Sequence, residues 1–514
     1  MRKEIKRIFC FLMLATMLLP VLNACSQKKI DVSNFTTIEE FNRKDIKIGA
    51  ALGSTSSLMI EKYFKDATFE NYGSGPEMLN ALEQGKIEAI VMEDYSYGLL
   101  KAGFPFLKPV GDIVVGQTAY AICFPKTEEG AKHQKEFNAF LAEYKQSGKL
   151  QEIIDFWFDL NLSPDVEVDV SELEDINGTL TMYTEAQARP FSFVYYLKNV
   201  GIDLVLVRDY CKEYGYALNI LKTSSVLPAV TTGKCDIAGS GIEIIDERKD
   251  KILYSDPVFV ANNNLFIRDP NYVKEKVGFI EGLKDDFEQT FIRENRYELF
   301  IEGIITTIII SVLSLIFGTI CGFLLYLAYY NGYKFIAKIF NFLSWLFSRL
   351  PMLVFLMFIL YVIFAKIDIS GMYVAIISFT IVFSTTTFTL LNSNVKNIEH
   401  GQIEAATSLG YNRTKTFFMI ILPQILPNVL PSYEAEILSL VKSTSIVGYV
   451  MVTDVTKAGD MVRSRTYIAF FPLIAVAFMY IILAKVLMIV VKFLGDALQN
   501  KLKIEKDKLK AKEI

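Results

Sequence analysis

Residue types that could carry out catalysis are sparse in this sequence. The chain has only two histidines, His133 and His400, and they lie far apart. It has no recognisable nucleophile–base set, no metal-ligand spacing and no Gly-x-x-x-x-Gly-Lys-Ser/Thr phosphate loop. The pair Gly233-Lys234 lacks both the upstream glycine and the following hydroxyl of such a loop. The sequence therefore predicts a protein that is not an enzyme, that holds no metal or cofactor, and that does not itself bind ATP.

One polar segment, residues 404–423, has the composition of a docking element. It begins EAATSLG, continues through a basic stretch and ends ILP, between segments apolar enough to cross a bilayer. Ala405 allows close approach of a helix, and Gly410 permits a sharp turn. Pro423 is expected to break the chain where the next helix begins. These residues predict a short helix, a turn and a second helix. Glu404 can pair with a basic residue on another chain; the alternative is an amphipathic hairpin with no partner.

The apolar residues, 52% of the sequence, are unevenly distributed. Residues 30–298 have a mixed composition, whereas residues 299–495 contain long uncharged runs that predict an all-α membrane domain of about five transmembrane helices. The expected spans are residues 303–330, 351–365, 369–395, 431–453 and 467–491. A net charge of −4 without a basic face argues against a nucleic-acid partner.

The N-terminus has the pattern of a targeting segment. Four basic residues within positions 2–7 precede an apolar stretch at 8–22 that is short for a spanning helix. The stretch ends LNAC, which resembles a bacterial lipobox. That resemblance implies a lipoprotein-type signal peptide over residues 1–25 and a lipid on Cys25. The alternative is an uncleaved signal anchor.

Charge placement predicts the orientation of the membrane domain. With residues 30–298 outside the cell, five spans place residues 396–430 and a Lys-rich tail, 496–514, in the cytoplasm, which agrees with the positive-inside rule. Three cations in an expected outer loop run against the rule: Lys457, Arg463 and Arg465. We expect a multi-pass protein of the bacterial plasma membrane.

The part of the chain before residue 271 alternates strand-like and helix-like segments, which is typical of open α/β sheets. Residues 81–89 resemble residues 229–237, since each reads as a helix closed by a glycine, Gly85 or Gly233, and followed by a strand. This echo predicts two similar lobes. Irregularly spaced cysteines in this part predict buried free thiols rather than a disulfide framework; they are Cys123, Cys211 and Cys235.

Several motifs of the membrane half resemble the permease subunits of polar amino acid ABC importers, in the histidine/glutamine permease family. They are the 401–423 segment, Glu302-Gly303, Arg349-Leu350-Pro351 and LVKSTSI at 440–446. The resemblance implies that a separate ATPase subunit binds ATP and docks on residues 401–423 through Glu404, Ala405, Gly410 and Pro423. It also implies a second permease subunit, which makes either a homodimer or a heterodimer.

The soluble half resembles polar-amino-acid solute-binding proteins, which have the bilobed type II periplasmic-binding-protein fold. Residues 179–268 resemble the first lobe of that family, residues 46–94 the second lobe, and residues 136–160 the closing helices. Because the usual last portion comes first, we predict one circularly permuted domain. Its parts are 30–165 for the second lobe and closing helices, 175–270 for the first lobe, and a linker over 271–298. The alternative is two degenerate tandem domains.

The same resemblance assigns ligand-binding roles, each with a structural alternative. Arg248 would bind a carboxylate, or be a surface arginine, and Phe193 would pack on the ligand side chain, or belong to the core. The remaining assigned residues are Ser54 and Thr55, as carboxylate donors or a plain helix cap, and Glu93, as the acid for the ligand ammonium. The sequence departs from the family at Glu243, which would neutralise Arg248 or bind a cationic ligand.

Together these features predict a permease with a fused extracytoplasmic binding domain, which imports a small polar solute, such as an amino acid. The alternative function is a ligand-gated channel or sensor that uses the same bilobed domain. Residues 446–449, IVGY, faintly resemble a potassium-filter sequence.

Overall fold

The computed structural model describes residues 30–510 apart from 102, 160–161, 224, 275–277, 348, 366, 368 and 469. The expected signal peptide and Cys25 lie outside the described residues. The chain forms two compact units, residues 1–118 with 261–275, and residues 119–260 with 276–514. We call the described part of the first unit the N-terminal lobe. Within the second unit, residues 119–260 are the central lobe and residues 278–510 are the membrane region.

The N-terminal lobe is built on a sheet with the order β2-β1-β3-β12. Strands β1, β2 and β3 are parallel, and β12 runs antiparallel to β3. Strands β1 and β3 in the middle of the sheet are mostly apolar and buried, as is typical of a sheet covered by helices. The elements are α2 (Ile38–Phe41), β1 (Lys47–Ala51), α3 (Thr55–Tyr63), β2 (Thr68–Tyr72), α4 (Gly75–Glu83), β3 (Ala89–Glu93), α5 (Asp94–Leu100), the first part of β4 (Leu107–Pro125) and most of β12 (Phe259–Arg268).

The central lobe has a second sheet, in the order β4-β10-β5-β9, with β11 also paired to β4. Strands β5, β9 and β10 are parallel, and β4 runs antiparallel to β10. A small antiparallel sheet, β6-β7-β8, follows β5. The elements are α6 (Glu128–Gln146), α7 (Lys149–Phe158), β5 (Thr179–Thr184), β6 (Gln187–Ala188), β7 (Ser192–Tyr195), β8 (Lys198–Val200), α8 (Ile202–Tyr214), β9 (Ala217–Lys222), α9 (Leu227–Thr231), β10 (Ile237–Glu243), a 3₁₀ turn (Asp246–Arg248) and β11 (Ile252–Tyr254).

The two lobes repeat one topology. In each, the first strand lies in the middle, the second on one side and the third on the other, beside an antiparallel strand. Gly85 and Gly233 occupy equivalent places, with φ of 65° and 67°, before β3 and β10. These backbone angles favour glycine, which explains the sequence echo. The predicted α/β fold with two similar lobes is confirmed.

The closing helices pack on the central lobe. His133 of α6 lies 3.1 Å, Nδ1 to Oη, from Tyr210 of α8, and Tyr144 of α6 donates a hydrogen bond to Asp209. The division between the units falls after Thr118. The side chains of these helices therefore contact the lobe that follows them in the sequence.

Among the described residues, the membrane region contains four helical stretches that are long and apolar enough to cross a membrane, or five if a bent pair counts as one span. They are Tyr297–Tyr330, Phe335–Phe347 with Met352–Ile363 as the bent pair, Gly371–Val395, Arg413–Val450 and Phe471–Ala497. Its named elements are α10 (Phe279–Phe287), α11 (Tyr297–Tyr330), α12 (Phe335–Phe347), α13 (Met352–Phe358), α14 (Gly371–Val395), α15 (His400–Ser408), α16 (Arg413–Thr416), α17 (Leu422–Ser443), α18 (Val455–Thr466) and α19 (Phe471–Lys510). This agrees with the predicted all-α domain of about five spans.

The fourth span begins earlier than expected. Helical structure runs from Arg413 to Val450 and passes through Pro423, which therefore does not break the chain. A π-helical turn, Phe417–Ile421, precedes the proline, which lies in the first turn of α17. A proline in the first turn removes an N–H that would lack a helical partner there. Residues 446–449 lie in a 3₁₀ segment, Thr444–Val450, that continues α17.

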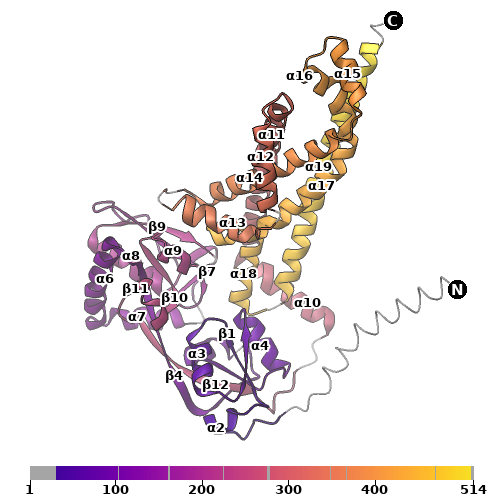
Figure 1. The fold of residues 1–514 in the computed structure, drawn as a ribbon. Coiled ribbons are helices and arrows are strands. Elements are labelled where there is room, and N and C mark those ends of the chain that lie inside the picture. Colours follow the sequence, from indigo (N-terminus) through magenta and orange to yellow (C-terminus); the bar gives the residue numbers. More distant parts are fainter. Residues whose placement is uncertain are drawn as a thin grey trace, which may run out of the picture. The chain divides into compact units, whose positions relative to one another are not determined.

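Helices α15 and α16 lie together at one end of the membrane region, and α18 lies at the other end (Figure 1). Cysteines 123, 211 and 235 are buried free thiols, as predicted.

Candidate functional site

The strand order of each lobe marks an edge where a ligand would bind. In open parallel sheets, ligands bind outside the carboxyl ends of the strands, where successive connections leave in opposite directions. In the N-terminal lobe this point lies between β1 and β3, and in the central lobe it lies between β5 and β10. We call these places the N-terminal edge and the central edge. The predicted binding residues other than Phe193 follow or end these strands.

Ser54 and Thr55 lie at the N-terminal edge, where α3 begins after β1. The Ser54 hydroxyl accepts a hydrogen bond from Ser57 N–H at 3.2 Å and donates one to the Ala51 carbonyl at 2.7 Å. Ser54 is therefore a helix cap, as its structural alternative states. The Thr55 and Thr118 hydroxyls are 2.6 Å apart. A ligand role for either residue stays a prediction.

A buried polar network supports this edge. Asn263 on β12 donates to the Thr118 hydroxyl at 2.6 Å and accepts from the Ser56 hydroxyl at 2.7 Å. All three side chains are buried. The network holds the start of α3 against β4 and β12. Sequence reasoning missed it, although the Asn262-Asn263-Asn264 run within an apolar strand was a visible signal.

Glu93 ends β3 at the same edge and lies opposite Asn263 in the β3–β12 register. The next residue, Asp94, accepts hydrogen bonds from the Tyr95 N–H at 2.8 Å and from the Asn262 side chain at 3.1 Å. Two consecutive carboxylates therefore lie where β3 passes into α5, beside the start of α3. Such a pair suits a ligand ammonium.

Glu243 and Arg248 lie at the central edge. Glu243 ends β10 opposite Tyr120 of β4, and Arg248 ends the 3₁₀ turn that follows. Burial raises the pKa of Tyr254, while a hydrogen bond with Arg248 opposes that shift. Glu243 and Arg248 thus lie in one short segment at the end of one strand, β10. The structure brings them to the same edge, as their assignment requires, while their contact with a ligand stays a prediction.

A buried carboxylate holds the backbone just before Glu243. The Oδ2 atom of Asp203, at the start of α8, accepts a hydrogen bond from Gly241 N–H at 2.8 Å. Gly241 has a φ of 61° and lies at an irregularity in the β10–β4 register. Burial raises the pKa of Asp203 to about 7, although the Gly241 bond lowers it. Asp203 therefore positions the end of β10.

Phe193 does not lie at either edge. It belongs to β7, is only 2% exposed, and meets the Trp157 ring edge to face at a centroid distance of 6.0 Å. The guanidinium groups of Arg189 and Arg465 lie 5.4 and 5.3 Å from its ring centre. This placement matches the core alternative. An aromatic cluster beside Glu243 is better placed for a ligand side chain; it comprises Tyr120, Phe191 and Phe259.

The predicted docking element has the expected helix–turn–helix form. Helix α15 ends before Gly410, whose φ of 80° lets the chain reverse into α16. Glu404 and Ala405 are exposed, while Ala406 is 1% exposed and packs inward. Leu409 at the turn is 77% exposed. The exposed face therefore offers a carboxylate and an apolar side chain to a partner.

No group of three or more His, Cys, Asp or Glu side chains suited to a metal ion occurs in the described part of the chain. The chemistry of both edges is that of polar binding.

Comparison with known proteins finds a family model that is similar to part of the membrane region. A family model described as "Binding-protein-dependent transport system inner membrane component" matches residues 314–504. The match includes α15, α16 and the continuous helix after them.

Similar curated proteins are permeases of named transport systems. The putative glutamine transport system permease protein GlnP of Rickettsia felis is 28% identical over 198 residues, which cover 38% of this chain and 90% of that protein. The arginine transport system permease protein ArtQ of Bacillus subtilis is 27% identical over 205 residues, 40% of this chain and 92% of that protein. Each relative is thus matched almost in full by less than half of this chain.

Among solved structures, "Crystal structure of an amino acid ABC transporter with histidines" is 24% identical. The match covers 44% of this chain and 99% of that chain, with a TM-score of 0.35.

Proposed function

We propose that the chain is an ABC import permease that carries its own solute-binding domain, from the premise that residues 314–504 match the family model of binding-protein-dependent transport system inner membrane components. The observation that carries the proposal is the repeated topology upstream. Two lobes with one strand order present charged residues at equivalent sheet edges, in the same polypeptide as the permease. A bilobed domain of this kind closes on its ligand by hinge motion.

The proposed ligand is a polar amino acid. Its carboxylate would be bound by Arg248 and by the hydroxyl and backbone donors of Ser54 and Thr55. Its ammonium would be bound by Glu93. Glu243 favours a ligand with a second cationic group, because an acid beside Arg248 otherwise weakens the attraction for a carboxylate. The names of the similar permeases, which include glutamine and arginine systems, agree with this ligand class.

The proposed motor is a separate ABC ATPase subunit. Residues 401–423 form the exposed helix–turn–helix at the end of the membrane region opposite α18 (Figure 1). Glu404, Ala405 and Leu409 would contact the motor, with Gly410 setting the turn. A second permease subunit, identical or different, completes the pathway. Positive-inside charge supports an extracytoplasmic binding domain and a lipid on Cys25 would hold the N-terminus at the membrane.

The channel alternative has no support. The similar proteins are permeases, and residues 446–449 belong to the helical segment after α17.

The ligand assignment is tested by thermal unfolding of the full-length protein in detergent, with a panel of amino acids. We expect a cationic or amide amino acid to raise the unfolding midpoint of the wild type. Arg248→Ala should abolish that rise. The matched control is Lys249→Ala, because Lys249 is exposed on the same turn and pairs with Asp246 at 2.7 Å. An undiminished rise in Arg248→Ala would contradict the assignment.

The transport assignment is tested in vesicles that contain the co-purified motor subunit. We expect the ligand to stimulate ATP hydrolysis in the wild type. Ion conductance in the absence of ATP would contradict the proposal.

A further inference from the structure

The central lobe and the membrane region share hydrophobic cores. Ala186 and Val194 of the lobe belong to one buried cluster with residues of α11 and α18, including Phe300, Ala458 and Met461. A second cluster joins α9 of the lobe, through Ala229 and Val230, to Phe355 and Leu356 of α13. Interfaces of permanent complexes have this apolar character and resemble a divided domain core. Transient docking surfaces are more polar.

A buried lysine lies between these clusters. Lys457 of α18 is 2% exposed, and its Nζ donates hydrogen bonds to the Glu185 carbonyl at 3.0 Å and the Thr223 carbonyl at 2.7 Å. Glu185 follows β5 and Thr223 follows β9. The membrane region therefore contacts the lobe at the carboxyl ends of its strands, beside the central edge.

The charges around Lys457 depend on each other. Burial lowers the pKa of Lys457 to about 8, and Glu185 opposes that shift. Burial likewise raises the pKa of Glu185, and Lys457 opposes it. The Glu185 carboxylate also accepts a hydrogen bond from Val226 N–H at 3.2 Å. Removal of the lysine would leave a buried acid and two buried carbonyls without their cation.

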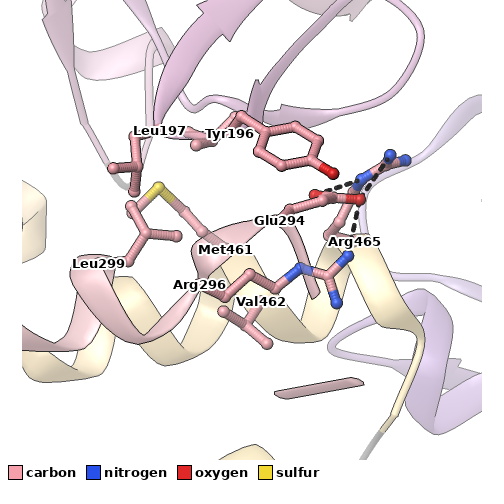
Figure 2. A pocket seen from close by; sticks show the side chains of 9 residues that line it. Tyr196, Leu197, Glu294, Arg296, Leu299, Met461, Val462 and Arg465 are labelled. Carbon is pink, nitrogen blue, oxygen red and sulfur yellow. Dashed lines mark hydrogen bonds and ion pairs between the residues drawn. The ribbon is translucent and has the colours of Figure 1, made fainter. Parts of the chain in front are cut away.

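Two further contacts flank this lysine. Glu294 pairs with Arg465 at 3.0 Å and with Arg296 at 2.9 Å (Figure 2). Arg465 also lies 5.3 Å from the ring centres of Phe193 and Tyr195 of the lobe. On the other side, Lys234 of the lobe donates to the Phe364 carbonyl at 2.6 Å and the Ile367 carbonyl at 2.5 Å.

We propose that the central lobe is a permanent part of the permease, fixed by Lys457 on Glu185 and Thr223. The lobe stays bound to the membrane region through the transport cycle. A conformational change at the central edge is transmitted directly to α18 through these two carbonyls. Detachable docking of the whole binding domain is then absent from the cycle. The inference concerns this joint alone, so it stands or falls separately from the choice of solute.

The proposal is tested by cutting the polypeptide between the binding lobes and the membrane region. A protease site is inserted between Lys274 and Gly278 of the full-length protein, which also carries a C-terminal affinity tag. After cleavage in detergent, we expect the fragment that ends near residue 274 to remain on the affinity resin through extended washing. Its release in the first wash would overturn the proposal.

Variants of Lys457 test whether this residue keeps the cut fragment bound. Lys457→Met should release the cut fragment at least tenfold faster than the wild type, and Lys457→Arg, which keeps the cation, should restore slow release. The control is Lys212→Met, an exposed lysine of α8, which should behave as the wild type. Equal release rates for Lys457→Met and Lys212→Met would overturn the role of this lysine.

Discussion

The N-terminal edge and the central edge arise from the same strand order but are supported in different ways. At the N-terminal edge, neutral hydroxyls and an amide of the same lobe support the start of α3: Ser56, Thr118 and Asn263. At the central edge the support comes from buried titratable side chains. Asp203 holds β10 from inside the lobe, and Lys457 holds β5 and β9 from the membrane region.

This difference shows that the strand order decides where a site lies. The side chains packed around the site decide how its backbone is held in place. A neutral network loses little when buried if each member is hydrogen-bonded. A buried ion costs much more, and is retained where its partner stays in place. The ionic support that Lys457 gives to the central edge therefore agrees with a central lobe that stays bound to the membrane region.

The largest expected difference between the edges is in how stability depends on pH, and Asp203 is its cause. Its pKa is raised from 3.8 to about 7 in the folded protein. The stability that it contributes is thus complete below pH 3.8 and is lost as the pH rises through 7, by about 4 kcal/mol at most. Asp203→Asn should remove this loss, so that the variant unfolds at a higher temperature than the wild type at pH 8 and at a similar one near pH 4.

The measurement is the unfolding midpoint of the full-length protein against pH. Asp155→Asn, on the exposed face of α7, is the control and should keep the profile of the wild type. A wild-type midpoint that stays constant between pH 4 and pH 8 would show that Asp203 does not differ from an exposed acid.

The next effect concerns the ionic support from the membrane region. Lys457→Met should lower the free energy of unfolding by about 3 kcal/mol, because the buried Glu185 loses its cation. The measurement is thermal unfolding at pH 7. Glu185→Gln together with Lys457→Met should recover part of the loss, since the uncompensated acid is then gone. A double variant no better than the single one would contradict the ionic explanation.

A smaller effect is expected at the neutral N-terminal edge. Asn263→Ala removes two hydrogen bonds and leaves two buried hydroxyls, of which that of Thr118 keeps the Thr55 hydroxyl as a partner. We expect a loss of about 2 kcal/mol in stability and no change in its pH dependence. Asn199→Ala, on the short strand β8, is a control asparagine outside either edge. A pH-dependent loss in Asn263→Ala would remove the contrast between the edges.

The smallest effect on stability is expected outside both edges, at Gly410. An added Cβ there meets no atom within 4 Å, so the cost of Gly410→Ala is only its φ of 80°, about 1 kcal/mol. Its effect on ligand-stimulated ATP hydrolysis should be larger than its effect on unfolding. Gly401→Ala, which also meets no atom within 4 Å and has no positive φ, is the control. Equal ATPase rates in both variants would argue against a docking role for the turn.

Local signals account for what the sequence predicted correctly. The echo between residues 81–89 and 229–237 reflects glycines that need positive φ, and the five spans follow from uncharged runs. Ser54, Glu93 and Arg248 lie where strands end, while their roles in ligand binding stay predictions. Pro423 lies where α17 begins, as expected, but the chain before it stays helical through a π-helical turn.

Long-range contacts account for what the sequence could not show. Lys457 and Glu185 are 272 residues apart, so no window of sequence pairs them. The sequence leaves Phe193 open between a ligand contact and the core, and its neighbours Trp157 and Arg465 come from distant parts of the chain. The three cations that disagreed with the charge rule all have partners: Lys457 on carbonyls, Arg463 on Asp460 at 3.3 Å, and Arg465 on Glu294. They are structural cations rather than topological signals.

The union of lobes and membrane helices in one polypeptide fixes their stoichiometry. In the proposed importer, each permease chain would bring one capture site of its own. The local concentration of receptor at the pathway is then constant, whatever the expression level. Uptake by such a chain would saturate with solute alone, at a concentration set by the affinity of the closed lobes.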